Sequence, residues 1–203
     1  MIIASKQSFL TEDMVNGYLH FADGAYLYIP FSATNKDKIQ MQFLFEYYAI
    51  NGNTSDYFMQ QEGSNWFSFE NNPDYKPYFN IGSTTFICQN ILKMYLNNWY
   101  LLDFTINNYN INVSLSNQTN STVVTANKNF SGSFSITNLY LSTYNTPSKD
   151  KTSKTNISYI NIYKNDEPIY LLKATSKNKM KNSVDNEYYI SPTGTTNFVK
   201  FNK

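Results

Sequence analysis

The chain has almost no cysteine or histidine, the residues that build disulfides and zinc sites. Its 203 residues include one cysteine, Cys88, and one histidine, His20. A single cysteine excludes an intramolecular disulfide. One cysteine and one histidine together cannot supply the ligand spacing of a zinc site. Arginine is absent, and the formal net charge is +1. Because nucleic-acid-binding proteins carry basic patches, we expect no nucleic-acid partner.

The two rare residues lie in strand-like runs rather than in catalytic patterns. Cys88 lies within the strand-like run 84–89, where a lone cysteine is usually a small core residue. No Ser–Asp partner stands near His20 in the sequence, so we interpret it as a histidine on a strand face and not as a triad member.

Long apolar runs are also missing. No segment reaches the length of a membrane span, and the apolar start lacks the basic and long hydrophobic regions of a signal peptide. We therefore expect a protein made in a cytoplasm and not inserted in a membrane.

Aromatic residues are abundant, with 18 Tyr and 15 Phe, and they favour β-strands. In the segment 38–48 every second residue is apolar, from Ile39 to Tyr47, and the residues between are mostly polar, which is typical of a strand with one buried face. The segment 99–117 predicts two further strands, with a tight turn at Asn107–Asn108. A shorter strand is expected over 25–29, stopped by Pro30.

No segment has a helical period, and short strands alternate with turn signals at a spacing of about 8–12 residues. We predict an all-β fold, a two-sheet antiparallel sandwich, in a single domain over residues 1–203 with a polar loop around 142–156. The side chains expected between the sheets are those of Ile39, Met41, Phe43, Phe45, Trp99, Leu101, Ile111, Val113, Phe134, Ile136, Ile160 and Ile162.

The C-terminal third carries a more specific pattern. Phe134–Leu141, then ISYINIYKNDEPIYLL (157–172) and NEYYISPTGTTNF (186–198), resemble the concanavalin A-like lectin/glucanase superfamily. The pattern looks most like the laminin-G-like domains of bacteriophage virion proteins, which WYLLDFTINNYNINVSLSN (99–117) and YLHFADGAYLYIPF (18–31) also resemble. The resemblance implies a jelly roll of two antiparallel sheets. One departure is Tyr170–Leu171, where the phage relatives usually carry an Arg–Asp pair.

The resemblance implies a non-enzymatic virion structural protein: a head-fibre, capsid decoration or tail-associated subunit. Such a protein would be made in the host cytoplasm, form homo-oligomers, contact other virion proteins and could bind host cell-surface or gut glycans. A stand-alone carbohydrate-binding module is the alternative. A glycoside hydrolase is disfavoured because the Glu-x-Asp run of the superfamily's glucanases is missing, so no catalytic residue is predicted.

The candidate ligand-binding residues are three aromatics and one aspartate, which lie near the loops between residues 51 and 77. Sugars stack on aromatic faces and bond to amide and carboxylate groups, which points to Trp66, Tyr75, Tyr57 and Asp74. The competing interpretation is that these residues belong to the core, the rim or an interface. No cofactor is expected. Calcium could be held by loop carboxylates, with Asp56, Asp74, Asp103 and Asp150 as the candidates, although no spacing singles them out.

Overall fold

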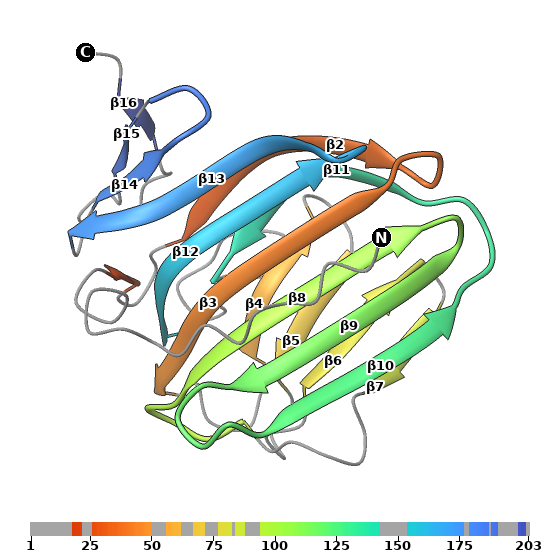
Figure 1. The fold of residues 1–203 in the computed structure, drawn as a ribbon, viewed down its shortest axis with the longest axis horizontal. Coiled ribbons are helices and arrows are strands. Elements are labelled where there is room, and N and C mark those ends of the chain that lie inside the picture. The colour runs from red at the N-terminus through yellow and green to blue at the C-terminus, as the bar shows by residue number, and fades with distance from the viewer. Residues whose placement is uncertain are drawn as a thin grey trace.

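The computed structural model describes residues 18–21, 26–49, 56–61, 67–71, 77–82, 84–87, 94–142, 154–176, 179–186, 188–190 and 199–201. They form two antiparallel β-sheets, one in front of the other in Figure 1. The predicted all-β jelly-roll sandwich is confirmed. Over these ranges, no helix is long and apolar enough to cross a membrane.

The larger sheet contains ten strands. In spatial order they are β10 (Val123–Asn129), β9 (Asn110–Asn117), β8 (Trp99–Asn107), β3 (Ile39–Ala49), β12 (Lys154–Lys164), β13 (Glu167–Ser176), β14 (Lys179–Asn182), β15 (Tyr188–Ile190) and β16 (Val199–Phe201), and β1 (Leu19–His20) also pairs with β12. Strands from both halves of the sequence therefore meet at the centre of this sheet.

The smaller sheet contains six strands. Their order is β2 (Leu27–Thr34), β11 (Ser135–Leu141), β4 (Asp56–Gln61), β5 (Phe67–Asn71), β6 (Pro77–Ile81) and β7 (Thr84–Ile87). In chain order the strands change sheet after β1, β2, β3, β7, β10 and β11, so both sheets are built from segments far apart in the sequence.

Aromatic side chains fill the space between the sheets. The rings of Phe45 on β3 and Phe58 on β4 stack with centroids 3.9 Å apart, and Phe43 meets Phe58 edge to face at 5.5 Å. Ring contacts of this kind add to the free energy of burying apolar surface. The alternation predicted for 38–48 is confirmed, since Ile39, Met41, Phe43 and Phe45 are all fully buried in this core.

The central hairpin forms as predicted, but its turn lies one residue later. β8 and β9 pair from Tyr100 with Asn117 to Asn107 with Asn110, which leaves Asn108 and Tyr109 as the turn. Both have positive φ, 48° and 61°, as a type I′ hairpin requires. The strained Tyr109 accepts a hydrogen bond from the Phe130 backbone N–H at 2.9 Å.

Ten of the twelve predicted core residues lie in the core, but Trp99 and Leu101 do not. The core-facing residues of β8 are Tyr100, Leu102, Phe104 and Ile106. Trp99 and Leu101 have the opposite parity and lie on the outer side of the large sheet. Trp99 is nevertheless buried and contacts the ring of Tyr18, with centroids 6.0 Å apart.

Pro30 does not end its strand, contrary to the prediction. β2 continues through it to Thr34 because β2 is an edge strand, where a missing N–H costs no ladder hydrogen bond. Side chains from the other sheet cover this edge: the Tyr170 hydroxyl donates to the Pro30 carbonyl at 2.7 Å, and Lys164 Nζ donates to the Ser32 carbonyl at 3.0 Å.

The polar loop predicted around 142–156 lies largely outside the described residues, but both of its ends belong to the sandwich. Residues 154–156 are already part of β12. Ser142 and Thr155 are fully buried and hydrogen-bond to each other through their hydroxyls. Because these positions are polar, the apolar pattern of the sequence could not indicate that both ends of the loop are buried. The extent of the single domain stays a prediction.

Candidate functional site

The outward side of the large sheet is a broad polar surface, called the outer face below. It is formed by the residues whose parity is opposite to the core. On five neighbouring strands they include Gln40, Gln42, Leu44 and Glu46 of β3, Trp99, Leu101, Asp103 and Thr105 of β8, Asn110, Asn112, Ser114 and Ser116 of β9, Val123, Thr125, Asn127 and Asn129 of β10, and Asn156, Tyr159, Asn161 and Tyr163 of β12.

Pairing between strands places the side chains of the outer face in rows. In the central row, Gln42 lies opposite both Asn161 and Asp103, and Asp103 is followed by Ser114 and then Thr125. Asn161 Nδ2 donates to Gln42 Oε1 at 3.3 Å, and Gln42 Nε2 donates to Asp103 Oδ2 at 2.7 Å. The row is therefore a chain of oriented amides that ends on one carboxylate.

The next row toward the β8–β9 turn contains Gln40, Thr105, Asn112 and Asn127. Asn127 Nδ2 donates to Asn112 Oδ1, and Asn112 Nδ2 donates to Asn110 Oδ1 at 2.8 Å. Asn110 in turn donates to Asn129 at 2.7 Å. Because each amide is held by its neighbours, its remaining donors and acceptors have fixed directions.

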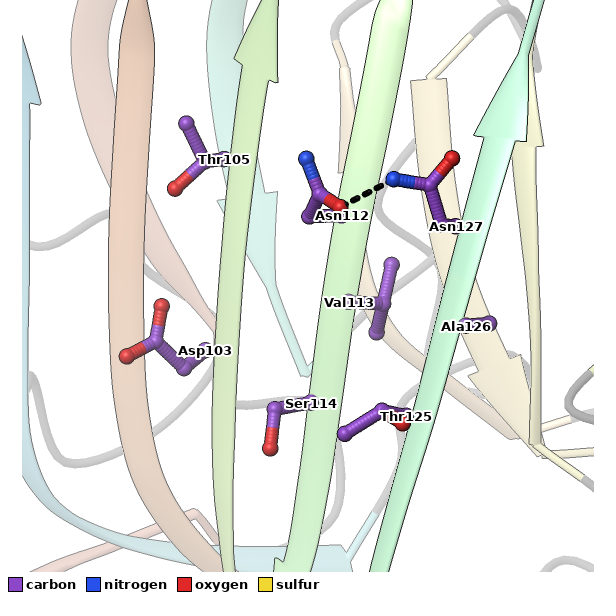
Figure 2. A pocket seen from close by; sticks show the side chains of 8 residues that line it. All are labelled: Asp103, Thr105, Asn112, Val113, Ser114, Thr125, Ala126 and Asn127. Carbon is purple, nitrogen blue, oxygen red and sulfur yellow. Dashed lines mark hydrogen bonds between the residues drawn. The ribbon is translucent and has the colours of Figure 1, made fainter. Parts of the chain in front are cut away.

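A shallow depression of about 300 Å³ lies where these two rows cross β8, β9 and β10. Figure 2 shows Asp103 and Thr105 on β8, Asn112 and Ser114 on β9, and Thr125 and Asn127 on β10 around it, with Val113 and Ala126 completing the lining. One carboxylate, three hydroxyls and two amides thus surround a space that is open to solvent.

The electrostatics of this site depend on Asp103. Burial raises the pKa of its carboxyl group above the usual 3.8, and the hydrogen bond from Gln42 opposes that shift. Burial also raises the pKa of Tyr159 from 10.0 to about 12, with a further contribution from the negative charge of Asp103. Tyr159 is therefore a neutral hydroxyl at physiological pH.

A second cluster lies at the opposite end of the outer face, where β1 joins β12. The ring of His20 stacks on Tyr48 with centroids 4.7 Å apart, and its Nδ1 lies 2.7 Å from Asn156 Oδ1. Asn156 Nδ2 donates to Glu46 at 3.3 Å. The expectation that His20 lies on a strand face is confirmed, and Asn156 fixes the orientation of its ring.

Most of the predicted site lies outside the described residues. This is true of Trp66, Tyr75 and Asp74. Tyr57 is described; it is partly buried on β4, in the small sheet and hence not on the outer face. The binding prediction for these four residues stays a prediction.

The outer face itself was not predicted as a site, and Asp103 was named only as a calcium candidate. The side chain of Asp56 and all of Asp150 also lie outside the description. Within the described ranges, no group of three or more His, Cys, Asp or Glu side chains could hold a metal ion. The one available signal was the alternation of Asn, Ser and Thr along 110–116 and 125–129.

Comparison with known proteins identifies the fold. No protein-family model and no curated protein matches the sequence. Among solved structures, the LG1-3 region of the laminin α2 chain is similar, with a TM-score of 0.54 and 15% identity, and covers 75% of this chain. This chain spans 32% of that region.

Two other structures resemble the chain less strongly. Domains LG4-5 of the mouse laminin α1 chain have a TM-score of 0.46 and 12% identity, covering 79% of this chain and 42% of theirs. A GH131 β-glucanase catalytic domain from Podospora anserina has a TM-score of 0.40 and 15% identity, and the match covers 64% of this chain and 59% of that domain's chain. The laminin α2 likeness shows the fold alone: a two-sheet antiparallel jelly roll similar to that of the laminin LG1-3 region.

Proposed function

We propose that this protein is a non-enzymatic, glycan-binding structural domain of a bacteriophage particle. The observation that carries the proposal is the outer face, with its shallow depression and its two rows of oriented amides and hydroxyls. Recognition of host cell-surface or gut glycans is the role that this surface fits.

A glycan presents many hydroxyl groups, each both a donor and an acceptor, on a flat and extended molecule. The depression offers side chains of matching chemistry: Asn112 and Asn127 supply amide groups, and Thr105, Ser114 and Thr125 supply hydroxyls. Polar groups that fix the orientation of a ligand are effective when they are held in place before binding. The hydrogen bonds within the amide network provide that rigidity.

The spacing of carboxylates supports binding without hydrolysis. β3 and β8 place two carboxylates on the outer face, those of Glu46 and Asp103. Asp103 lies opposite Gln42, four residues along β3 from Glu46. At about 3.4 Å per residue that separation is roughly 14 Å, whereas glycosidases place their two carboxyl groups roughly 5–10 Å apart.

The particle context of the proposal rests on the resemblance of the sequence to laminin-G-like virion domains. In that context the protein would be made in the host cytoplasm, reside in the virion, and contact further copies of itself and other virion proteins. Exposed apolar side chains, with Tyr95 at 55% and Val123 at 45% of their surface accessible, offer contact area for such neighbours.

A glycan array probed with the purified protein tests this function. Wild type should be retained by at least one polysaccharide, and Asn112→Ala and Thr125→Ala should weaken retention. Thr137→Ala is the matched control, because Thr137 is also an exposed strand threonine but lies on β11 of the other sheet. A Trp66→Ala variant tests the site predicted from the sequence. Absence of retention on every glycan, in a folded protein, would contradict the proposal.

A further inference from the structure

We propose that the glycan bound at the depression carries a free amino group, and that its ammonium is held by Asp103. The inference rests on the proposed function and narrows its ligand to a cationic amino sugar. It comes from one feature of the depression: a single carboxylate placed among neutral groups.

Asp103 has few partners for a partly buried charge. Its described hydrogen bond comes from a neutral amide, Gln42 Nε2, at 2.7 Å. None of the eight residues that line the depression is basic. A partly buried carboxylate without a cation is costly, because one hydrogen bond from a neutral amide offsets only part of the hydration that the charge loses.

The described strands around Asp103 do not present a cation to it either. The ionisable group that faces it from β12 is Tyr159, whose raised pKa keeps it neutral. β3 presents Gln42, and β9 presents Ser114. Lys128 on β10 pairs with Ile111 and therefore has the parity of the core side. Since none of the described residues brings a cation to Asp103, we assign that charge to the ligand.

The neutral neighbours favour an ammonium over a metal ion. Calcium needs six to eight oxygen ligands and usually several carboxylates, and the described residues contain no such cluster. A primary ammonium has three N–H donors and one positive charge. Asp103 can accept one donor, and the hydroxyls of two neighbours, Thr105 on the same strand and Ser114 on the next strand, can accept the others (Figure 2).

The test compares oligosaccharides of glucosamine and of galactosamine, each in free-amine and N-acetylated form, by isothermal titration calorimetry at about pH 6. The acetyl group removes the charge and leaves the ring unchanged. Wild type should bind a free-amine form about tenfold more tightly, the size expected of one charge-assisted hydrogen bond. Asp103→Asn, which keeps the shape of the side chain, should abolish this preference. Raising the salt to about 0.5 M should reduce it.

Several outcomes would overturn the inference. Equal affinity for the two forms, or a preference that survives in Asp103→Asn, would refute the ammonium site while leaving glycan binding intact. Binding of Ca²⁺ that Asp103→Asn abolishes, without binding of either amino sugar, would show a metal site instead. Failure of all four oligosaccharides to bind would also refute the inference, and the glycan array would then decide separately whether the proposed function fails with it.

Discussion

Replacing Phe43 with alanine should lower the free energy of unfolding by about 3–5 kcal/mol, the range found for core phenylalanines. The side chain is fully buried, and its ring lies 5.5 Å from that of Phe58 and 6.3 Å from that of Phe104. Burial of a side chain of this size contributes about 1.5–3 kcal/mol, and each aromatic contact adds about 0.5–1.5 kcal/mol. The variant loses both and leaves a cavity between the two sheets.

Urea unfolding followed by tryptophan fluorescence would measure this loss, with thermal unfolding as a second readout. For a domain of this size 1 kcal/mol corresponds to about 2–4 °C in Tm, so a decrease of roughly 6–20 °C is expected. Gln40→Ala is the control, because Gln40 is on the same strand but on the outer face. Its effect should stay within about 0.5 kcal/mol. Equal stability of wild type and Phe43→Ala would refute the assignment of β3's faces.

Three further predictions concern pH, the covered edge and catalysis. Burial raises the pKa of Asp103 in the folded state. Its contribution to the free energy of unfolding should therefore be complete below about pH 3.8 and should be lost as the pH rises through the folded pKa. Urea midpoints measured across pH should show this loss in wild type and not in Asp103→Asn. Tyr170→Phe deletes the hydroxyl that donates to Pro30 and should cost about 0.5–1.5 kcal/mol; an unchanged urea midpoint would mean that this bond does not stabilise the covered edge. Incubation with β-glucans should release no reducing ends, and release that disappears in Glu46→Gln would show that the protein is an enzyme.

The assembly of the protein can be tested independently of its ligand. Light scattering coupled to size-exclusion chromatography should show oligomers, since exposed apolar side chains such as Tyr95 and Val123 favour self-association. A uniform monomer at high protein concentration would count against a homo-oligomeric particle component.

The sequence predicts strands well where one parity is clearly apolar. In β3 the residues Phe43 and Phe45 alternate with Gln42 and Glu46, so the buried face could be assigned directly. β8 is apolar on both parities, and local pattern cannot choose between Trp99 with Leu101 and Tyr100 with Leu102. Its pairing with β3 and β9 makes that choice, which depends on contacts far apart in the sequence.

The outer face could not be found from the sequence for a related reason. Gln42, Asp103 and Asn161 are at least 58 residues apart along the chain, and only the register of β3, β8 and β12 brings them into one row. Single polar residues on strands are also expected wherever a face is solvated. The amide network becomes visible as a site only once the strands are assembled.

The central claim is that the outer face binds glycans, and NMR chemical-shift mapping tests it most directly. A polysaccharide fragment retained in the array would be titrated into ¹⁵N-labelled protein, with the backbone amides of β8, β9 and β10 as reporters. We predict that the perturbed amides cluster at Asp103, Thr105, Asn112 and Asn127. Perturbations confined to the segment around Trp66 and Tyr75, with those four amides unchanged, would contradict this assignment of the binding site.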